Sequence, residues 1–267
     1  MRIAPVAAIL LRQWYLLRGS PVRALPMFAW VGIDIVLWGF IARFLNSVSA
    51  AGINFTTVFL GAVLLWDLCG RVMQGLTTAF LEDVWSRNFL NLFASPLRIS
   101  EYVTGLVLAS IATSLIGLTV MVALAVPVFG LSFLALGAHL LLFLAVLYGF
   151  GVALGIMASA MVLRFGPASE WLVWPIPALL SPFCGVFYPL SVLPAWMRAV
   201  AHLLPPSYVF EGMRALLQGR ASPLSSVLFA AALAALEILL AGYCFVRVYR
   251  YAVRTGLLAR YSAETVS

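Results

Sequence analysis

Long apolar stretches alternate with short polar ones along the chain, and this pattern predicts helices that cross a membrane. A helix needs about 20 apolar residues to cross about 30 Å of hydrocarbon, and six stretches approach or exceed that length. They run from about Ala24 to Leu45, from about Phe55 to Leu81, from Tyr102 to Phe129, from Leu131 to Leu163, from near Trp171 into a proline-rich region, and from about Pro223 to Tyr249. The pattern predicts an all-α membrane protein with six transmembrane helices in a single membrane domain over residues 1–267.

Residues 1–20 precede the first predicted span and are less uniformly apolar. Apolar side chains such as Ile3, Val6, Leu10 and Trp14 recur there at helical spacing, which predicts an amphipathic helix on the inner membrane surface. Arg12 interrupts the apolar run too early for a secretory signal peptide.

Arginine placement predicts the orientation of the spans. The first 23 residues and the tail after residue 246 each contain four arginines, and cytoplasmic segments of membrane proteins are enriched in basic residues. Both ends are therefore expected in the cytoplasm, which requires an even number of spans. The loops at 82–101 and 164–170 are then also inside.

Residues 187–221 depart from this rule, because they should lie outside and yet contain Arg198, Arg214 and Arg220. Prolines divide them into two short apolar pieces, one from about Pro194 to Leu204 and one that starts after Ser207, a candidate N-cap. Each piece is too short to span, so the pattern predicts re-entrant or interfacial helices.

Composition excludes several classes of protein. Hydrophobic residues make up 64% of the chain and charged residues 9%, against about 25% charged in soluble domains, so a soluble fold is excluded. All sixteen basic residues are arginine, and a Walker A loop needs a lysine, so this chain cannot hydrolyse ATP by the usual route. The net charge of +7 indicates positive inside loops rather than nucleic-acid binding. The three cysteines show no metal or disulfide spacing.

The inside loop at 82–98 is predicted to form a short amphipathic helix. Asp83 and Arg87 are spaced for an i,i+4 ion pair. An apolar stripe is formed by Trp85, Phe89, Leu92 and Phe93. Two interpretations remain open: aromatic anchoring at the interface, or a helix that fits a groove on a soluble partner.

Charge inside a membrane span is costly and often functional, and the candidate residues are Asp34, Asp67, Arg71 and Glu237. Asp67 and Arg71 are four residues apart and are expected to pair, in a packing role or in a transport pathway. Asp34 and Glu237 have no partner in their own spans. Each is expected to face a cavity between subunits or to meet an arginine of a neighbouring span.

Two segments give the chain a resemblance to a known family. The first is Asn91-Leu92-Phe93-Ala94-Ser95-Pro96-Leu97 leading into Glu101-Tyr102, and the second runs from Phe187-Tyr188-Pro189-Leu190 through Leu193-Pro194-Ala195-Trp196-Met197 to Leu204-Pro205-Pro206-Ser207-Tyr208-Val209-Phe210-Glu211-Gly212-Met213-Arg214. In the order and spacing of these segments and the spans, the chain resembles the membrane (permease) subunit of type-two ABC exporters.

The resemblance implies a homodimer of this chain above two copies of a separate ABC ATPase, which binds ATP and magnesium. No cofactor is expected in this chain. The resemblance places ATPase coupling at Glu82, Asp83, Trp85, Arg87, Asn88 and Phe89. It places an exit gate in the re-entrant segment at 187–214, with the candidate residues Tyr188, Pro189, Trp196, Pro205, Tyr208, Glu211 and Arg214. Glu211 and Arg214 are also spaced for a local ion pair.

The function expected from this resemblance is ATP-driven export of an amphipathic or lipid-linked substrate, either a glycan or polysaccharide or a drug-like molecule. The expected location is a bacterial inner membrane. The alternative is an ion-coupled secondary transporter that uses Asp34, Asp67 or Glu237, although the lack of an internal repeat counts against it. A membrane enzyme is disfavoured, because the chain has two histidines and dispersed carboxylates without a nucleophile motif.

Overall fold

The computed structural model is helical throughout the part of the chain that it describes, residues 2–48, 56–86, 92, 95–133 and 136–257. The longer helices are α1 (Ile3–Arg18), α2 (Pro21–Val48), α3 (Gly61–Trp85), α5 (Ile99–Phe129), α6 (His139–Phe165), α10 (Pro205–Leu217) and α11 (Leu224–Arg254). The shorter ones are η1 (Thr56–Leu60), η3 (Pro167–Ser169), α7 (Glu170–Val173), α8 (Ile176–Cys184), η4 (Leu190–Val192) and α9 (Ala195–Ala201).

Four helices of the described part are long and apolar enough to cross a membrane: Thr57–Trp85, Ile99–Phe129, His139–Phe165 and Leu224–Arg254. They contain 27 to 31 residues, so at 1.5 Å per residue each is about 40–46 Å long, more than the hydrocarbon core requires. They correspond to the predicted second, third, fourth and sixth spans. Large apolar side chains such as Leu141 and Leu239 are about 70% exposed, as expected for side chains that face lipid.

The first and fifth predicted spans are not among these four helices. The first coincides with α2, whose 28 residues give about 42 Å of helix, and its crossing of the membrane stays a prediction. The fifth is divided into α7 and α8, with Trp174 and Pro175 between them. Pro175 precedes α8 and Pro182 lies within it, and proline interrupts the backbone hydrogen bonding of a helix. Neither piece alone can span.

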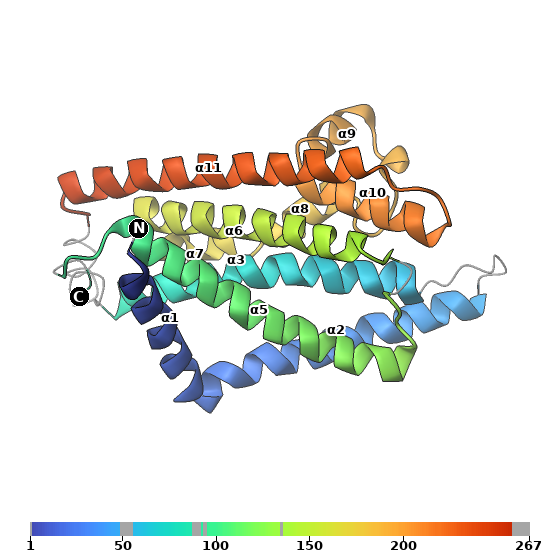
Figure 1. Cartoon of the computed structure of the whole chain (residues 1–267), viewed down its shortest axis with the longest axis horizontal. Coiled ribbons are helices and arrows are strands. Elements are labelled where there is room, and N and C mark those ends of the chain that lie inside the picture. The colour runs from blue at the N-terminus through green and yellow to red at the C-terminus, as the bar shows by residue number, and fades with distance from the viewer. Residues whose placement is uncertain (1, 49–55, 87–91, 93–94, 134–135, 258–267) are drawn as a thin grey trace.

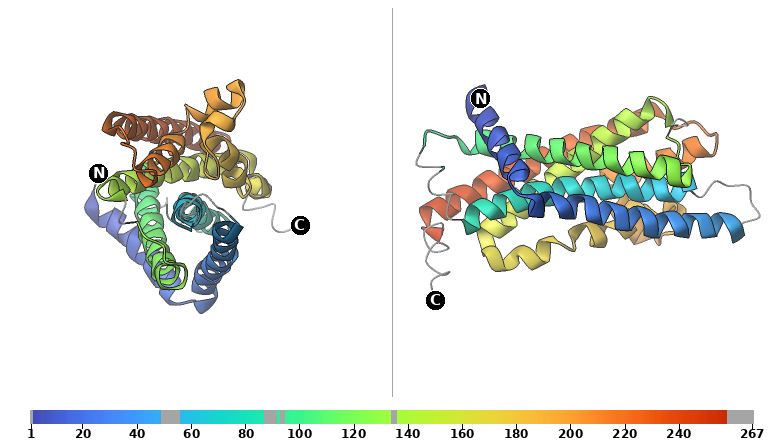
Figure 2. Two further views of the ribbon diagram at one scale, coloured as in Figure 1. Left: turned by 90° about the vertical axis from the view of Figure 1, so that its right-hand side faces the viewer. Right: turned by 90° about the horizontal axis from the view of Figure 1, so that it is seen from below.

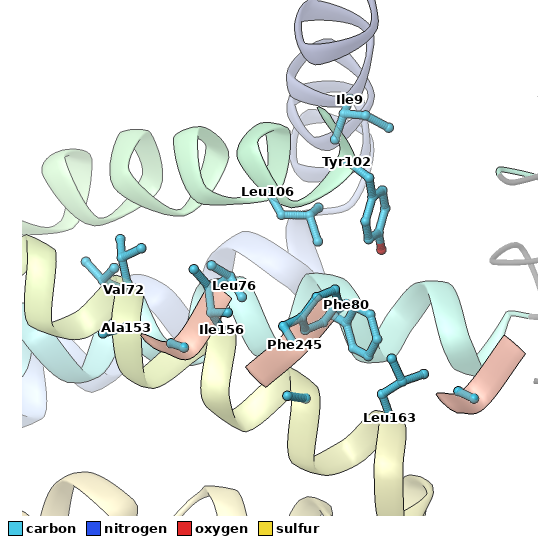
Figure 3. Close-up of a cluster of buried hydrophobic side chains, with 14 residues drawn as sticks. Ile9, Val72, Leu76, Phe80, Tyr102, Leu106, Ala153, Ile156, Leu163 and Phe245 are labelled. Atoms are coloured by element: carbon cyan, nitrogen blue, oxygen red, sulfur yellow. The ribbon is translucent and has the colours of Figure 1, made fainter. Parts of the chain in front are cut away.

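The centre of the bundle is formed by α3, α6 and α11, which run side by side (Figure 1). Gly151 and Gly155 of α6 allow α3 to approach closely: a methyl group at Gly151 would stand 2.8 Å from the carbonyl oxygen of Cys69, and one at Gly155 would stand 3.1 Å from Cβ of Leu76. The glycine pair therefore serves close packing between α6 and α3. Leu76, Ile156 and Phe245 belong to the cluster of buried side chains in Figure 3.

The helices α1, α2 and α5 form a triangle beside this centre (Figure 1). The contact between α1 and α5 is close, because a methyl group at Gly105 would meet Cβ of Ile9 at 2.6 Å. The contact between α2 and α5 is equally close at the far end of α5, where the ring of Phe129 covers Gly39. The predicted surface helix is present as α1, but Val6 and Ile9 are its buried side chains, while Ile3 and Trp14 are exposed.

The short helices α8, α9 and α10 gather at one end of the bundle (Figure 1). The start of α1 and the end of α11 lie at the opposite end (Figure 1). In Figure 2 (left), α9 stands out from the rest of the molecule, whereas α10 packs against α6, α8 and α11. The two predicted short pieces are therefore helices of unequal burial, one exposed and one integrated into the bundle.

Candidate functional site

Three regions contain the predicted site residues, and we use inner and outer for the ends of the bundle that the arginine pattern predicts to face the cytoplasm and the exterior. The first region is a buried ionic cluster near the inner end of α3. Two guanidinium nitrogens of Arg12 donate to the two carboxylate oxygens of Asp83, with Arg12 Nη1 3.0 Å from Asp83 Oδ2. The hydroxyl of Tyr102 donates to the same Oδ2 at 2.7 Å. The Asp83 side chain is fully buried and that of Arg12 is 28% exposed. The cluster Arg12–Asp83–Tyr102 therefore ties α1, α3 and α5 together.

The charges of Arg12 and Asp83 neutralise each other in this cluster. A bidentate guanidinium–carboxylate pair is among the stronger hydrogen-bonded arrangements in proteins, and the hydrogen bond to Asp83 raises the pKa of Arg12 above its ordinary value. Apolar packing surrounds the tyrosine, whose ring centroid lies 6.4 Å from that of Phe80. A buried ion pair is costly to break, because its remaining partner loses its counter-charge in a poorly solvated place.

A second ionic contact fastens the start of α1 to the start of α5. Glu101 accepts from the backbone nitrogen of Arg2 at 3.0 Å and from its Nη2 at 2.9 Å. It also accepts from the backbone nitrogen of Arg98 at 3.1 Å, as the N3 residue of a capping arrangement. Arg2 also donates to the carbonyl of Pro96. The end of the 82–98 segment is thus connected to α1 as well.

The predicted coupling residues divide into two groups in the structure. Glu82, Asp83 and Trp85 form the last turn of α3, so the predicted separate helix is wrong for this part of it, because α3 continues without a break to Trp85. Trp85 is 49% exposed and is available to a partner, whereas Asp83 is buried. Arg87, Asn88 and Phe89 lie outside the described residues, and with them the predicted Asp83–Arg87 pair.

The second region is the segment at 185–214. Glu211 accepts from the backbone nitrogen of Leu190 at 2.8 Å and from Nη2 of Arg214 at 2.9 Å, which confirms the predicted Glu211–Arg214 pair. Arg214 is buried and its Nη1 lies 3.5 Å from the carbonyl oxygen of Val186. These two side chains hold the turn at 185–190 against α10.

The remaining residues of the predicted gate lie around this turn. The hydroxyl of Tyr188 donates to the carbonyl of Pro182 at 2.9 Å, and Pro189 precedes η4. Trp196 is 64% exposed on α9, and the hydroxyl of Tyr208 donates to the carbonyl of His202 at 3.0 Å. Burial raises the pKa of Tyr208. The predicted gate residues therefore form one connected outer structure.

The predicted start of the second short helix is wrong by three residues. α10 begins at Pro205, with Leu204 as the N-cap, because two consecutive prolines suit the first turn of a helix, where no backbone donor is needed. Ser207 is not an N-cap. Its hydroxyl lies 2.7 Å from the carbonyl oxygen of Ala201 and joins α9 to α10.

Three aromatic rings connect this outer structure to α2 and η1. The ring centroid of Trp38 lies 5.5 Å from that of Phe59 and 5.7 Å from that of Phe187. The centroids of Phe59 and Phe187 are 5.6 Å apart. Movements of α2 would thus reach the outer turn through direct ring contact.

The third region contains the charges within the bundle. Arg71 and Asp67 form the predicted i,i+4 pair. Both line a cleft of about 660 Å³ between α1, α2, α3 and α5, and Asp34 lines the same cleft. Glu237 on α11 does not line it, and its Oε2 is buried without a hydrogen-bond partner among the described residues. Within that part of the chain, no three His, Cys, Asp or Glu side chains are gathered to hold a metal ion.

Comparison with protein families identifies the kind of molecule that carries these features. A family model for the ABC-2 type transporter matches residues 7–217, from α1 to the end of α10. The chain belongs to the ABC-2 transporter family. No curated protein matches this chain. This ABC-2 chain is accordingly a multi-pass membrane subunit of a transporter, and its family implies an ABC ATPase as a partner.

Sequence reasoning missed the partners of the acidic residues at the inner end of this ABC-2 subunit. Arg2 and Arg12 were interpreted only as positive inside charges, and Tyr102 only as part of a family motif. One signal was present: Asp83 and Glu101 are acidic residues in an otherwise arginine-rich inner region. Each of them binds an arginine of α1.

Proposed function

We propose that this chain is the permease of an ATP-driven exporter built from two copies of the chain and two copies of an ABC ATPase. Its substrate is amphipathic or lipid-linked and leaves the cytoplasm or the inner leaflet. Its membrane is a bacterial inner membrane, with both ends of the chain in the cytoplasm. Family membership supports the transporter class and the ATPase partner, and it does not favour the ion-coupled alternative.

The observation that carries this proposal is the Arg12–Asp83–Tyr102 cluster. The family resemblance implies that the N-terminal surface helix contacts the same ATPase subunit as residues 82–98, and this helix is α1. The cluster joins α1 to the last turn of α3, and Arg2–Glu101 joins α1 to the start of α5. Because these contacts fix α1, α3 and α5 to one another, a partner that moves either segment moves all three helices together.

The continuity of α3 supports transmission of this movement through the bundle. α3 contains 25 residues, which corresponds to about 37 Å of unbroken helix. Trp85 is at one end, Arg71 lies along the cleft, and η1 continues the helix at the other end, where Phe59 contacts Phe187. In the proposed mechanism, ATP closes the ATPase pair, α3 shifts, and the cleft and the outer turn change shape together.

The outer structure supports a gate at the exit. The turn at 185–190 is held by Glu211 and Arg214 on α10, and it contacts α2 through Phe187. A shift of α2 or α3 would therefore pull on a turn whose other side is fixed. Release of that turn is the proposed opening step on the outer side.

Purification of the chain with its ATPase from the native membrane tests the proposal. Trp85→Ala should abolish co-purification of the ATPase or lower its permease-stimulated activity at least tenfold, because Trp85 is an exposed aromatic residue and such residues dominate interfaces. Trp196→Ala is the matched control, since Trp196 is also exposed but lies at the opposite end. It should leave ATPase association unchanged.

Either of two results would contradict the proposal. If no chain with a Walker A loop co-purifies, or if Trp85→Ala and Trp196→Ala affect association equally, the ATPase does not dock at this end. Proton- or sodium-coupled flux in liposomes, with variants of Asp34, Asp67 and Glu237, would then test the ion-coupled alternative directly.

A further inference from the structure

The cleft between α1, α2, α3 and α5 lies within one chain and has the size of a ligand site. Its volume is about 660 Å³, inside the range of about 300–1,000 Å³ that is common for small-molecule pockets. The side chains that line it come from α1, α2, α3 and α5 and from Trp174, all within one copy of the chain.

One wall of the cleft is a polar stripe on α3. Asp67, Arg71, Gln74, Thr78 and Glu82 all line it, and their spacing of three or four residues places them on one face of the helix. From Asp67 to Glu82 the stripe extends over about 22 Å of α3. It connects the middle of a membrane-crossing helix to the last turn of that helix, where Asp83 and Trp85 lie.

The charges of Asp34, Asp67 and Arg71, which all line the cleft, do not balance. Arg71 forms an ion pair with Asp67 and also acts electrostatically on Asp34. One guanidinium therefore faces two carboxylates, and Asp34 forms no hydrogen bond or ion pair of its own among the described residues. An excess of negative charge at membrane depth requires a cation or a proton.

The remaining walls are partly apolar and partly polar. Leu16 and Leu17 of α1 and Trp174 are apolar, whereas α5 contributes mainly hydroxyl side chains, those of Ser110, Thr113 and Ser114. The apolar part accepts the hydrophobic substituents of a ligand, and Trp174 adds an aromatic face that favours cations. Gln13 on α1 also lines the cleft, and its Nε2 is buried without a hydrogen-bond partner among the described residues.

We infer that this cleft binds an organic cation with apolar substituents, whose charged centre lies against Asp34. The cation is either a free amphiphile or the amine headgroup of a lipid, because both present the same chemistry. That this cation is what the exporter transports rests on the proposed function. Binding itself requires neither the ATPase nor ATP.

Equilibrium binding of tetraphenylphosphonium to the purified full-length chain in maltoside micelles tests the inference. This probe is a permanent cation with four apolar rings, and tetraphenylborate has the same shape with the opposite charge. The chain should bind tetraphenylphosphonium at least tenfold more tightly than tetraphenylborate, after subtraction of binding to empty micelles. Competition by added phosphatidylethanolamine identifies a lipid headgroup as the natural source, and its absence identifies a free amphiphile.

Three variants locate the binding. Asp34→Asn should weaken tetraphenylphosphonium binding about tenfold, the factor that corresponds to about 1.4 kcal/mol. Thr113→Trp should abolish it by filling the cleft, which Thr113 lines. Glu237→Gln is the matched control: it removes another intramembrane carboxylate, one that does not line the cleft, and should leave binding unchanged.

The inference is overturned if tetraphenylborate binds as well as the cation, or if Asp34→Asn and Glu237→Gln have the same effect. If Asp34→Asn does not yield a folded protein, Thr113→Trp decides, since a folded filled-cleft variant that still binds the cation also overturns it. Failure of Trp85→Ala to affect ATPase association would refute the proposed function while leaving these binding results in force.

Discussion

Replacement of Asp83 by asparagine tests the most consequential contact of the structure. The substitution keeps the shape of the side chain but removes the charge that Arg12 meets, and it replaces one of the two acceptor oxygens by an amide donor. Breaking a buried ion pair by neutralising one partner costs about 3–5 kcal/mol. Because the Arg12 side chain is 28% exposed and can recover some hydration, we expect the lower end, a loss of about 3 kcal/mol in the free energy of unfolding.

A double-mutant cycle with Arg12→Gln isolates the pair from other effects of each substitution. If the two charges stabilise each other, Asp83→Asn in the Arg12→Gln background should cost less than in the wild type. We expect a coupling energy of about 2 kcal/mol, within the range for residues in direct contact. Equilibrium unfolding of the purified chain in mixed detergent micelles measures all four corners of the cycle.

Glu170→Gln provides the control for this cycle. Its carboxylate accepts a hydrogen bond from Trp174 Nε1 at 3.1 Å in an exposed position, so its loss should change stability by less than about 0.5 kcal/mol. The reasoning is refuted if Asp83→Asn also falls within that range, or if Asp83→Asn and Arg12→Gln are additive. Either result would mean that the cluster does not hold α1 to α3.

Two further substitutions test the packing of the bundle and the outer turn. Gly151→Ala should destabilise the chain by about 1–3 kcal/mol in the same unfolding assay, since the new methyl group would meet a backbone oxygen of α3 at 2.8 Å. Gly242→Ala is the control and should be neutral or stabilising, because nothing lies within 4 Å of a methyl group there. Equal effects of the two substitutions would refute the close approach of α3 and α6. Glu211→Ala should free the turn that Glu211 holds through the backbone nitrogen of Leu190. A cysteine introduced at Leu190, which is 8% exposed, should then react with a polar maleimide several-fold faster than in the presence of Glu211. Glu211→Gln, which keeps an acceptor, should show a smaller increase. An unchanged rate in Glu211→Ala would show that the turn does not depend on this contact.

The helices that cross the membrane could be predicted from sequence, because hydrocarbon imposes a simple requirement on length and polarity. The stretches from Tyr102 to Phe129 and from Leu131 to Leu163 contain no Asp, Glu, Lys or Arg, and each contains one long helix. The region after Trp171 is also apolar enough to cross a membrane. Its prolines nevertheless divide it into α7 and α8, and a count of apolar residues does not detect such a break.

Local pairs were also within reach of sequence reasoning, whereas distant ones were not. Asp67–Arg71 and Glu211–Arg214 lie within one helical turn, so their spacing alone implies contact. Arg12 and Asp83 are 71 residues apart, and nothing in either neighbourhood indicates the other. Sequence spacing favours the local pair of Asp83 with Arg87. The actual partner, Arg12, comes within reach of Asp83 only when α1 folds against α5. The cleft was inaccessible for the same reason, since four helices supply its walls.

The contact between Gly39 and Phe129 has a consequence for how this sequence can change over evolutionary time. A methyl group at position 39 would stand 2.3 Å from the ring of Phe129, so even alanine is excluded while that ring keeps its place. The ring is the end of a rotatable side chain, and a smaller residue at position 129 would remove the obstacle. These two positions, 90 residues apart in the chain, are therefore expected to vary together among homologues, with glycine at 39 kept wherever an aromatic residue occupies 129.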